Sequence, residues 1–184
     1  MPNPPLLLDA CVTINLVAAG QIHQIARSIG RSCLVTRQAA NEVGHLRDTR
    51  DGETRVIPVN LTDHVQPGAF EIIDLAPDEI TLFVELASLV DDGEASTIAV
   101  AVKRGMPLAT DDRKARRLCT ERGLAPPTGT VTLIRHYCEA QALNHAHVSH
   151  LLQRISSRAS FQAPRSDPDL KWWNDHQPNA ANEG

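Results

Sequence analysis

The chain has 184 residues, of which 42% are hydrophobic and only 3% aromatic, and its formal net charge at pH 7 is -4. This length supports one hydrophobic core rather than two full domains, and the core must be built from aliphatic side chains. The negative net charge excludes a general electrostatic attraction to nucleic acid, so any such binding requires a local basic patch.

In the first half of the chain, short apolar runs predict strands, and apolar residues at helical spacing predict helices. Strands are expected at residues 6–9, 32–36 and 70–75, with an edge strand at 55–61. Helices are expected at residues 13–19, 21–28 and 37–46. The rest of the stretch 47–68 is charged and punctuated by Gly and Pro, so we expect a loop there.

The second half is predicted to be mainly helical. Helices are expected at residues 78–89, 93–104, 111–122, 130–142 and 146–158, with one strand at 108–110. Strands that alternate with helices indicate an α/β layered fold with a mainly parallel sheet. From residue 164 the chain is rich in Pro, Asp, Asn and Gln, so we expect a domain over 6–158 and a flexible C-terminal tail over 164–184.

Two acidic sites follow predicted strands directly. Asp9 ends the first strand, and the pair Asp111 and Asp112 ends the strand at 108–110. In open α/β sheets, ligands bind beyond the carboxyl ends of strands. The alternative is helix capping: Asp9 can cap the next helix, and one of Asp111 and Asp112 is expected to be an N-cap, which leaves the other free as a ligand. The sequence does not decide which of the two caps.

Two further acidic residues are expected on the apolar faces of helices. Glu94 shares a helical face with Ile98 and Ala101, and Glu42 lies between Ala39 and Leu46 at helical spacing. A first-turn glutamate also complements the helix dipole, and a glutamate stem can lie along apolar surface. Neither alternative explains why all four acidic sites would face inward together.

Inward carboxylates repel one another unless a cation lies among them. We therefore expect Mg²⁺ or Mn²⁺ at a catalytic site whose candidate oxygen ligands are Asp9, Glu42, Glu94, Asp111 and Asp112. Such a cation activates water against a phosphodiester, which predicts a metal-dependent nuclease.

A basic run follows this acidic cluster along the chain. Thr110, Arg113, Lys114 and Arg116 are candidate contacts to the phosphates of a nucleic acid substrate. A charged run of this kind is equally typical of a solvated helix face.

Three segments carry a resemblance to a known family. They read GEASTIAVA at residues 93–101, LATDDRKAR at 108–116 and GTVTLI at 129–134. With Asp9 and Glu42 at its other two acidic positions, the chain resembles the PIN-domain family from about residue 6 to residue 158, and especially its prokaryotic members.

The resemblance implies a Rossmann-like α/β/α sandwich and a Mg²⁺- or Mn²⁺-dependent endoribonuclease that cuts RNA. It implies Asp9, Glu42, Glu94 and one or both of Asp111 and Asp112 as metal ligands. Many prokaryotic members are toxins of toxin–antitoxin pairs, so an antitoxin protein and a homodimer are implied as partners. This sequence departs from the family at Cys11, where Ser or Thr is common, and it has Glu94 where the toxins commonly have aspartate.

Other functions compete with the nuclease. A phosphatase of the haloacid dehalogenase type also uses an aspartate at the end of its first strand, but the segment after Asp9 lacks the second aspartate of that chemistry. A non-catalytic PIN-like module that binds RNA or a protein partner is the main alternative. The closely spaced His145, His147 and His150 have no Cys or carboxylate at zinc-site spacing, so we interpret them as surface residues.

The cellular location follows from what the chain lacks. No apolar run is long enough to span a bilayer, and the first residues have no charged region of a secretory signal. We expect a cytoplasmic protein that does not enter a membrane. The four cysteines are dispersed and form no CxxC pair, so reduced thiols are expected.

Overall fold

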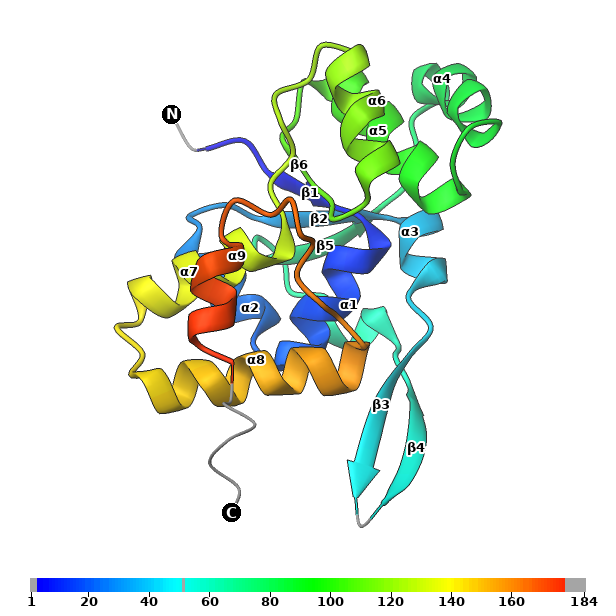
Figure 1. Cartoon of the computed structure of the whole chain (residues 1–184). Coiled ribbons are helices and arrows are strands. Elements are labelled where there is room, and N and C mark those ends of the chain that lie inside the picture. Colours follow the sequence, from blue (N-terminus) through cyan, green and yellow to red (C-terminus); the bar gives the residue numbers. More distant parts are fainter. Residues whose placement is uncertain (1–2, 51, 178–184) are drawn as a thin grey trace.

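The centre of the molecule is a four-stranded sheet with the strand order β5-β2-β1-β6, shown in the computed structural model of Figure 1, which describes residues 3–50 and 52–177. Its strands are β1 (Leu6–Leu8), β2 (Cys33–Thr36), β5 (Phe70–Ile73) and β6 (Leu108–Ala109). All neighbouring strands pair in parallel, and Leu7 of β1 pairs with Leu34 on one side and Leu108 on the other. The predicted α/β fold with a parallel sheet is confirmed.

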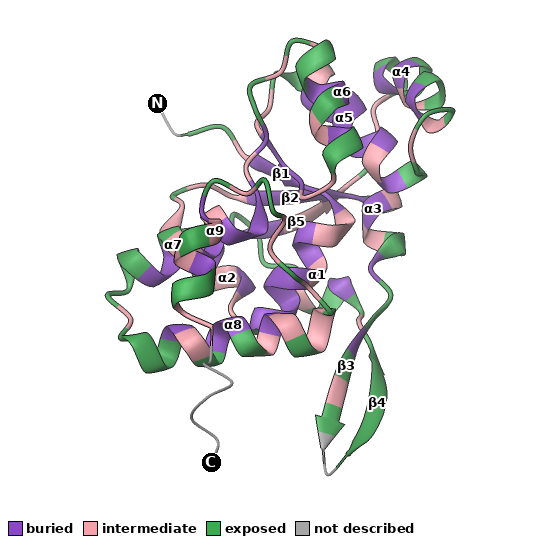
Figure 2. Cartoon of the chain, viewed as in Figure 1, coloured by how far each residue is buried: buried purple, intermediate pink, exposed green. Residues whose placement is uncertain are grey.

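Helices cover both faces of this sheet, so its central strands β1 and β2 are buried at every residue. Leu6 and Leu8 point to one layer and Leu7 to the other, because side chains alternate along a strand. The first layer contains α1 (Ala10–Ala19), α2 (Ile22–Ser28), α7 (Thr130–Ala140) and α8 (His145–Ala159). The second contains α4 (Pro77–Ala87), α5 (Asp92–Arg104) and α6 (Arg113–Glu121). The buried residues of Figure 2 concentrate where these layers face the sheet.

The prediction of a helix over residues 37–46 is wrong at its C-terminal end. Helix α3 (Arg37–Glu42) stops at Glu42, because Val43 adopts an extended backbone. A β-hairpin follows, in which β3 (His45–Arg50) pairs antiparallel with β4 (Glu53–Pro58). Residues 47–50 and 53–54 of the expected loop are therefore strand, and the edge strand expected at 55–61 corresponds to β4. The hairpin projects from the body of the molecule in Figure 1, and β4 is exposed along its whole length. A short 3₁₀ turn, η1 (Leu61–His64), leads back to β5.

The C-terminal segment is folded as far as it is described. Residues expected in a flexible tail form helix α9 (Leu170–Asp175), and Trp173 is only 1% exposed. Trp173 contacts the ring of Phe161 edge-on, with ring centroids 5.2 Å apart. Burial of one large aromatic side chain thus outweighs the polar composition that predicted a tail. The part of the predicted tail at residues 178–184 lies outside the described residues.

Two expectations from composition bear on the fold. Within residues 3–50 and 52–177, no helix combines the length and the apolar character that crossing a membrane requires. Cys33, Cys119 and Cys138 are free and buried, and Cys11 is free and half-buried.

Candidate active site

Asp9 lies where β1 ends and α1 begins, at the carboxyl edge of the sheet. It is the N-cap of α1, and its Oδ1 atom accepts a 2.8 Å hydrogen bond from the backbone N–H of Val12. The residue is only 3% exposed. Burial raises the pKa of Asp9 to about 6, although hydrogen bonds from Thr110, Val12 and Cys11 oppose that shift. Capping and a ligand role are therefore compatible, because the cap uses one of the two carboxylate oxygens.

Cys11, at the position where the resembled family commonly has Ser or Thr, supplies a hydrogen bond to Asp9. Its Sγ atom lies 3.1 Å from each carboxylate oxygen of Asp9. Burial and the charge of Asp9 raise the pKa of the Cys11 thiol far above its usual range, so the group is neutral and acts as a donor. The departure from the family at this position thus keeps a donor next to Asp9.

Asp112, not Asp111, is the N-cap of α6. Its Oδ1 atom accepts hydrogen bonds from the backbone N–H groups of Lys114 and Ala115, at 2.7 and 2.8 Å. Its charge is among the causes that raise the pKa of Glu94. The charge of Asp112 thus reaches Glu94, whereas the charge of Asp111 contributes to the raised pKa of Asp9.

Asp111 is held by donors from two helices of the first layer. It accepts hydrogen bonds from the backbone N–H of Thr130 at 2.9 Å and from its hydroxyl at 2.6 Å. The side-chain amide of Asn15 lies 3.4 Å from Asp111 Oδ2 and donates to the Thr130 hydroxyl at 3.0 Å. Burial raises the pKa of Asp111, and the two bonds from Thr130 oppose the shift. Asn15 escaped the sequence analysis because an asparagine inside an apolar helix gives no sign of its partner.

Glu94 lies in the first turn of α5 and is half-buried. Its pKa is raised to about 7, first by burial and then by the charges of Asp91, Asp112, Asp9 and Glu42. Its carboxylate is therefore within electrostatic reach of acidic groups from β1, α3 and the start of α6. Asp91 itself caps α5 by accepting from the Glu94 backbone N–H at 2.8 Å.

Glu42 reaches the site by a different route from the one predicted. It is the last residue of α3 and is exposed overall, and Leu46 lies beyond the helix in β3, so the two do not share a helical face. The Oε1 atom of Glu42 instead accepts a 2.6 Å hydrogen bond from the backbone N–H of Gly93. Burial raises the pKa of Glu42, and this hydrogen bond opposes the shift. A Cβ atom at position 93 would lie 2.1 Å from Glu42 Oε2, so the glycine makes room for the carboxylate.

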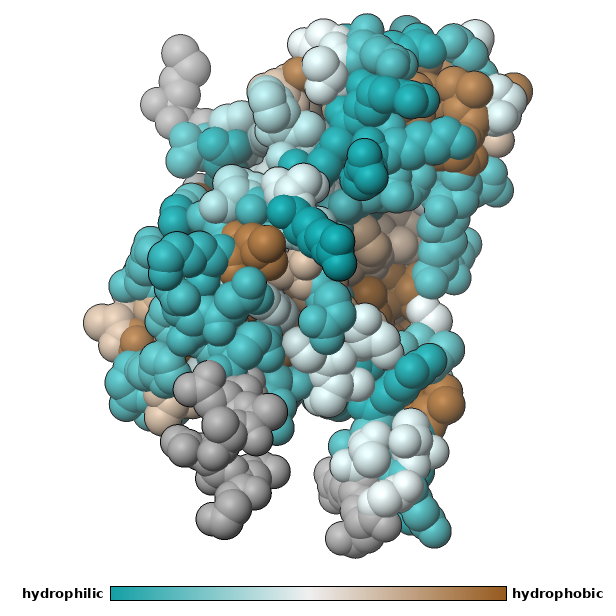
Figure 3. All heavy atoms as spheres, in the orientation of Figure 1, coloured by the Kyte–Doolittle hydropathy of each residue, from teal (hydrophilic) through white to brown (hydrophobic). Residues whose placement is uncertain are grey.

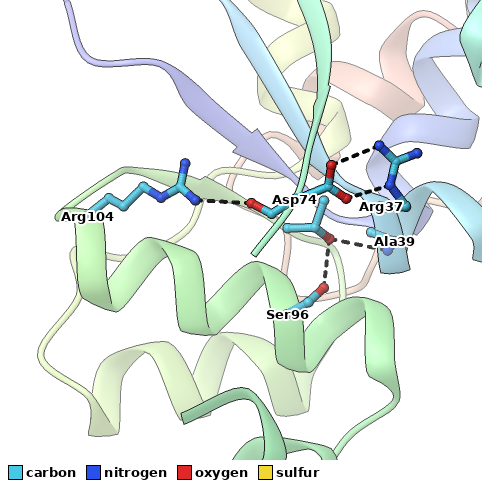
Figure 4. A network of polar contacts seen from close by, with 6 residues as sticks. Arg37, Ala39, Asp74, Ser96 and Arg104 are labelled. Atoms are coloured by element: carbon cyan, nitrogen blue, oxygen red, sulfur yellow. Dashed lines mark hydrogen bonds and ion pairs between the residues drawn. The ribbon is translucent and has the colours of Figure 1, made fainter. Parts of the chain in front are cut away.

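A polar network fixes α3 against α5 at the end of β2 (Figure 4). The Thr36 hydroxyl lies 2.7 Å from the hydroxyl of Ser96 on α5 and accepts a 3.2 Å bond from the Ala39 backbone N–H. Arg37 pairs through two nitrogens with the Asp74 carboxylate, at 2.5 and 2.9 Å. The helices that carry Glu42 and Glu94 are thereby held in a fixed relation.

The four candidate substrate contacts fall into different environments. Thr110 is fully buried and accepts a 3.1 Å bond from the Asp112 backbone N–H, so it positions the acidic residues. The amine of Lys114 donates to the carbonyl of Leu89. Arg116 is half-buried and donates from Nη1 to the Pro127 carbonyl at 2.8 Å, whereas Arg113 is exposed.

The acidic residues of this region offer oxygen ligands to a divalent cation. In the described part of the chain, no three His, Cys, Asp or Glu side chains lie close enough to form a ready-made ligand set. Asp9, Glu42 and Glu94 also have no ion pair with a basic residue there. Their mutual charge raises the pKa of Glu94, and an all-oxygen donor set is the one that Mg²⁺ prefers. Charge and donor chemistry thus fit a hard cation.

Comparison with known proteins identifies a family. A family model described as a PIN domain matches residues 6–165, which is most of the chain. None of the curated proteins compared with the chain matches it. The resemblance noted in the sequence is confirmed at the level of the family, and the match ends before Asp167 and the helix that carries Trp173.

Proposed function

The chain belongs to the PIN-domain family, and on that premise we propose that it is a ribonuclease that depends on Mg²⁺ or Mn²⁺. One observation carries the proposal. Near the carboxyl edge of the parallel sheet, where ligands bind in open α/β folds, burial and the charges of Asp91, Asp112, Asp9 and Glu42 raise the pKa of Glu94. Acidic groups from separate elements therefore act on one carboxylate.

Asp9, Glu42, Glu94 and Asp112 would hold the cation. When bound, a divalent cation lowers the pKa of water and stabilises negative charge on the scissile phosphate. Val12 and Cys11 orient the Asp9 carboxylate. Asp111 acts as a positioning residue, since its bonds to Thr130 tie the end of β6 to α7.

Cleavage of a mixed-sequence RNA by the purified full chain tests the proposal. Mn²⁺ and Mg²⁺ should support cutting, and EDTA should abolish it. Asp9→Asn and Glu94→Gln should each lower the cleavage rate by at least about 100-fold. Loss of a residue that only supports a metal ligand already lowers activity by up to about 100-fold, and loss of a ligand should cost more. Asp63→Asn is the matched control, because that carboxylate is exposed and lies in the 3₁₀ turn.

The outcomes separate the competing functions. Full activity of Asp9→Asn with a retained circular dichroism spectrum would refute the site. RNA that is bound equally well with and without metal, and never cut, would favour the non-catalytic binding module. A phosphoaspartate trapped at Asp9 would instead indicate a phosphatase.

A finer proposal concerns control of the nuclease by an antitoxin protein. Helix α4 exposes Ile80 and Val84, which are 48% and 62% exposed, and Leu89 just beyond it is 44% exposed. Apolar surface gathers in this region in Figure 3, and exposed apolar patches mark protein interaction sites. Expression of the wild-type chain should arrest growth, and a small protein encoded beside its gene should relieve the arrest. Arrest that persists with Asp9→Asn would contradict a nuclease toxin.

A further inference from the structure

A small cavity opens beside the candidate active site, between the start of α6 and the C-terminal segment at residues 164–168. Its volume is about 140 Å³, and its lining includes Arg113, Arg116, Pro164, Ser166, Asp167 and Pro168. Drug-sized ligands occupy pockets of about 300 to 1,000 Å³, so this cavity suits a single planar group rather than a whole nucleotide. Asp111 also lines it, which places it next to the proposed site of cleavage.

The C-terminal wall of the cavity is held in place by the fold. Asp169 is 8% exposed, accepts a 2.7 Å bond from the Thr132 hydroxyl and pairs with Arg135 at 2.8 Å. Two residues earlier, the Asp167 backbone N–H donates to the Pro164 carbonyl at 2.9 Å. With Trp173 in the core, these contacts make the segment a fixed part of the surface around the site.

Acceptor and donor groups meet inside the cavity. The Oδ1 atom of Asp167 accepts from the Asp169 backbone N–H at 2.8 Å, and Oδ2 has no hydrogen bond in the part of the chain that is described. A Cβ atom at Gly129 would lie 2.8 Å from Arg116 Nη2, 2.9 Å from Asp111 Oδ1 and 3.3 Å from Asp167 Oδ2, so these three groups converge on the glycine. Arg113 adds an exposed guanidinium at the rim.

This combination favours a nucleobase over a phosphate. Asp111 and Asp167 would repel a phosphate, whereas Pro164 and Pro168 offer apolar walls to a flat ring. Single-stranded RNA is read through hydrogen bonds to the edges of unstacked bases. Guanine presents two acceptors, O6 and N7, to a guanidinium, and two donors, N1–H and N2–H, to a carboxylate.

We propose that this cavity binds a guanine next to the scissile phosphate, with Asp167 accepting from the base and Arg113 and Arg116 donating to it. The inference rests on the proposed function for its position in the substrate, but the binding of the base does not require cutting. It makes Asp167, which lies outside the family match, a residue that determines specificity.

Nucleotide binding by the full chain in EDTA tests this directly. Isothermal titration should show that guanosine 5′-monophosphate binds about tenfold more tightly than the adenosine, cytidine and uridine monophosphates, the ratio expected from one bidentate base contact. Asp167→Asn should remove this preference while keeping the bond from the Asp169 backbone. Asp175→Asn is the matched control, because Asp175 is exposed on α9 and pairs only with Lys171 among the described residues.

Two further variants make the result decisive. Arg113→Ala should weaken guanosine monophosphate binding selectively, which tests the pocket even if Asp167→Asn fails to fold. Asp9→Asn should keep the guanine preference although it stops cleavage. Equal binding of all four nucleotides, weakened equally by Arg113→Ala, would show a phosphate site and overturn the proposal.

Mapping of cut sites separates this inference from the nuclease itself. The wild-type chain should cut a mixed-sequence RNA with a guanine enriched at one position beside the cut, and Asp167→Asn should lose that enrichment. Metal-dependent cutting with no base preference would overturn the guanine pocket and leave the ribonuclease standing. A wild-type chain that prefers guanosine monophosphate but cuts no RNA would support the pocket and contradict the nuclease.

Discussion

The Glu42 carboxylate accepts a 2.6 Å hydrogen bond from the backbone N–H of Gly93, across 51 positions of sequence. The bond connects the last residue of α3 to the first turn of α5, one residue before Glu94. It gives Gly93 two tasks, to donate this hydrogen bond and to leave space for the carboxylate that receives it.

Gly93→Ala should therefore separate activity from stability. The new Cβ atom would lie 2.1 Å from Glu42 Oε2, and the flexible glutamate side chain can move away at little cost. Alanine also favours a helix over glycine by about 1 kcal/mol, so the melting temperature should not fall. RNA cleavage should fall about tenfold or more, in the range seen when residues that support a metal site are lost.

Gly44→Ala is the control, because the nearest atom to its Cβ would lie 4.0 Å away. A Gly93→Ala variant with wild-type cleavage would show that the position of Glu42 is not needed for catalysis.

The raised pKa of Asp9 predicts how the stability of the metal-free protein depends on pH. Its pKa is about 6 in the folded state against 3.8 ordinarily, so the folded state binds the proton more tightly. The stabilising contribution is complete below about pH 4 and is lost as pH rises through about 6. At about 1.4 kcal/mol per pKa unit, the contribution of this buried group is on the order of 2 to 3 kcal/mol.

Asp9→Asn should remove this contribution, because the amide does not titrate. In EDTA, the free energy of unfolding of the wild type should fall relative to the variant between pH 4 and pH 7. Mn²⁺ should restore the wild type and not the variant. Parallel pH profiles for the two proteins would contradict the assignment of a charged, buried Asp9.

Alanine substitutions of Asp111 and Asp112 should lower the free energy of unfolding by different amounts. Asp112→Ala removes a helix N-cap, which costs about 1 kcal/mol. Asp111→Ala leaves the Thr130 backbone N–H and hydroxyl without their acceptor in a buried region, and each such loss costs about 1 to 3 kcal/mol. Urea unfolding should rank Asp111→Ala as clearly the less stable variant. The reverse order would show that Asp111 is not the residue that ties β6 to α7.

Trp173 should matter to global stability although it lies in the segment expected to be a tail. Trp173→Ala should cost about 3 to 5 kcal/mol, as for other buried tryptophans. Trp172→Ala is the matched comparison, because Trp172 is only half-buried, and it should cost less. Equal effects of the two substitutions in urea unfolding would mean that α9 does not pack on the core in solution.

The features that the sequence predicted correctly are those that follow from local patterns of apolar residues. The apolar run before Asp9 and the spacing of Ile98 and Ala101 behind Glu94 identified the central strand and α5, and with them two of the acidic residues. What it missed depends on contacts between distant segments. The end of α3 at Glu42 is fixed by pairing within a hairpin, such as Leu46 with Ile57, which no helical periodicity reveals.

Contacts between distant segments also limited what the sequence could predict about the site. The adjacent aspartates looked equivalent in sequence, and their difference arises from Thr130 and Asn15, which are brought to Asp111 by α7 and α1. The C-terminal helix was missed because burial of Trp173 and the contacts of Asp169 with Thr132 and Arg135 hold it in place, rather than a repeating pattern of apolar residues.

The placement of both tryptophans in α9 has a practical consequence. The chain has only two, Trp172 and Trp173, so its intrinsic tryptophan emission reports on this helix alone. Trp173 lies in an apolar environment and should emit at short wavelength, whereas water should shift its emission to the red if the helix detaches. Asp167 and Asp169 connect this helix to the cavity beside Asp111. The emission of the unlabelled protein therefore reports whether the C-terminal wall of the site is in place.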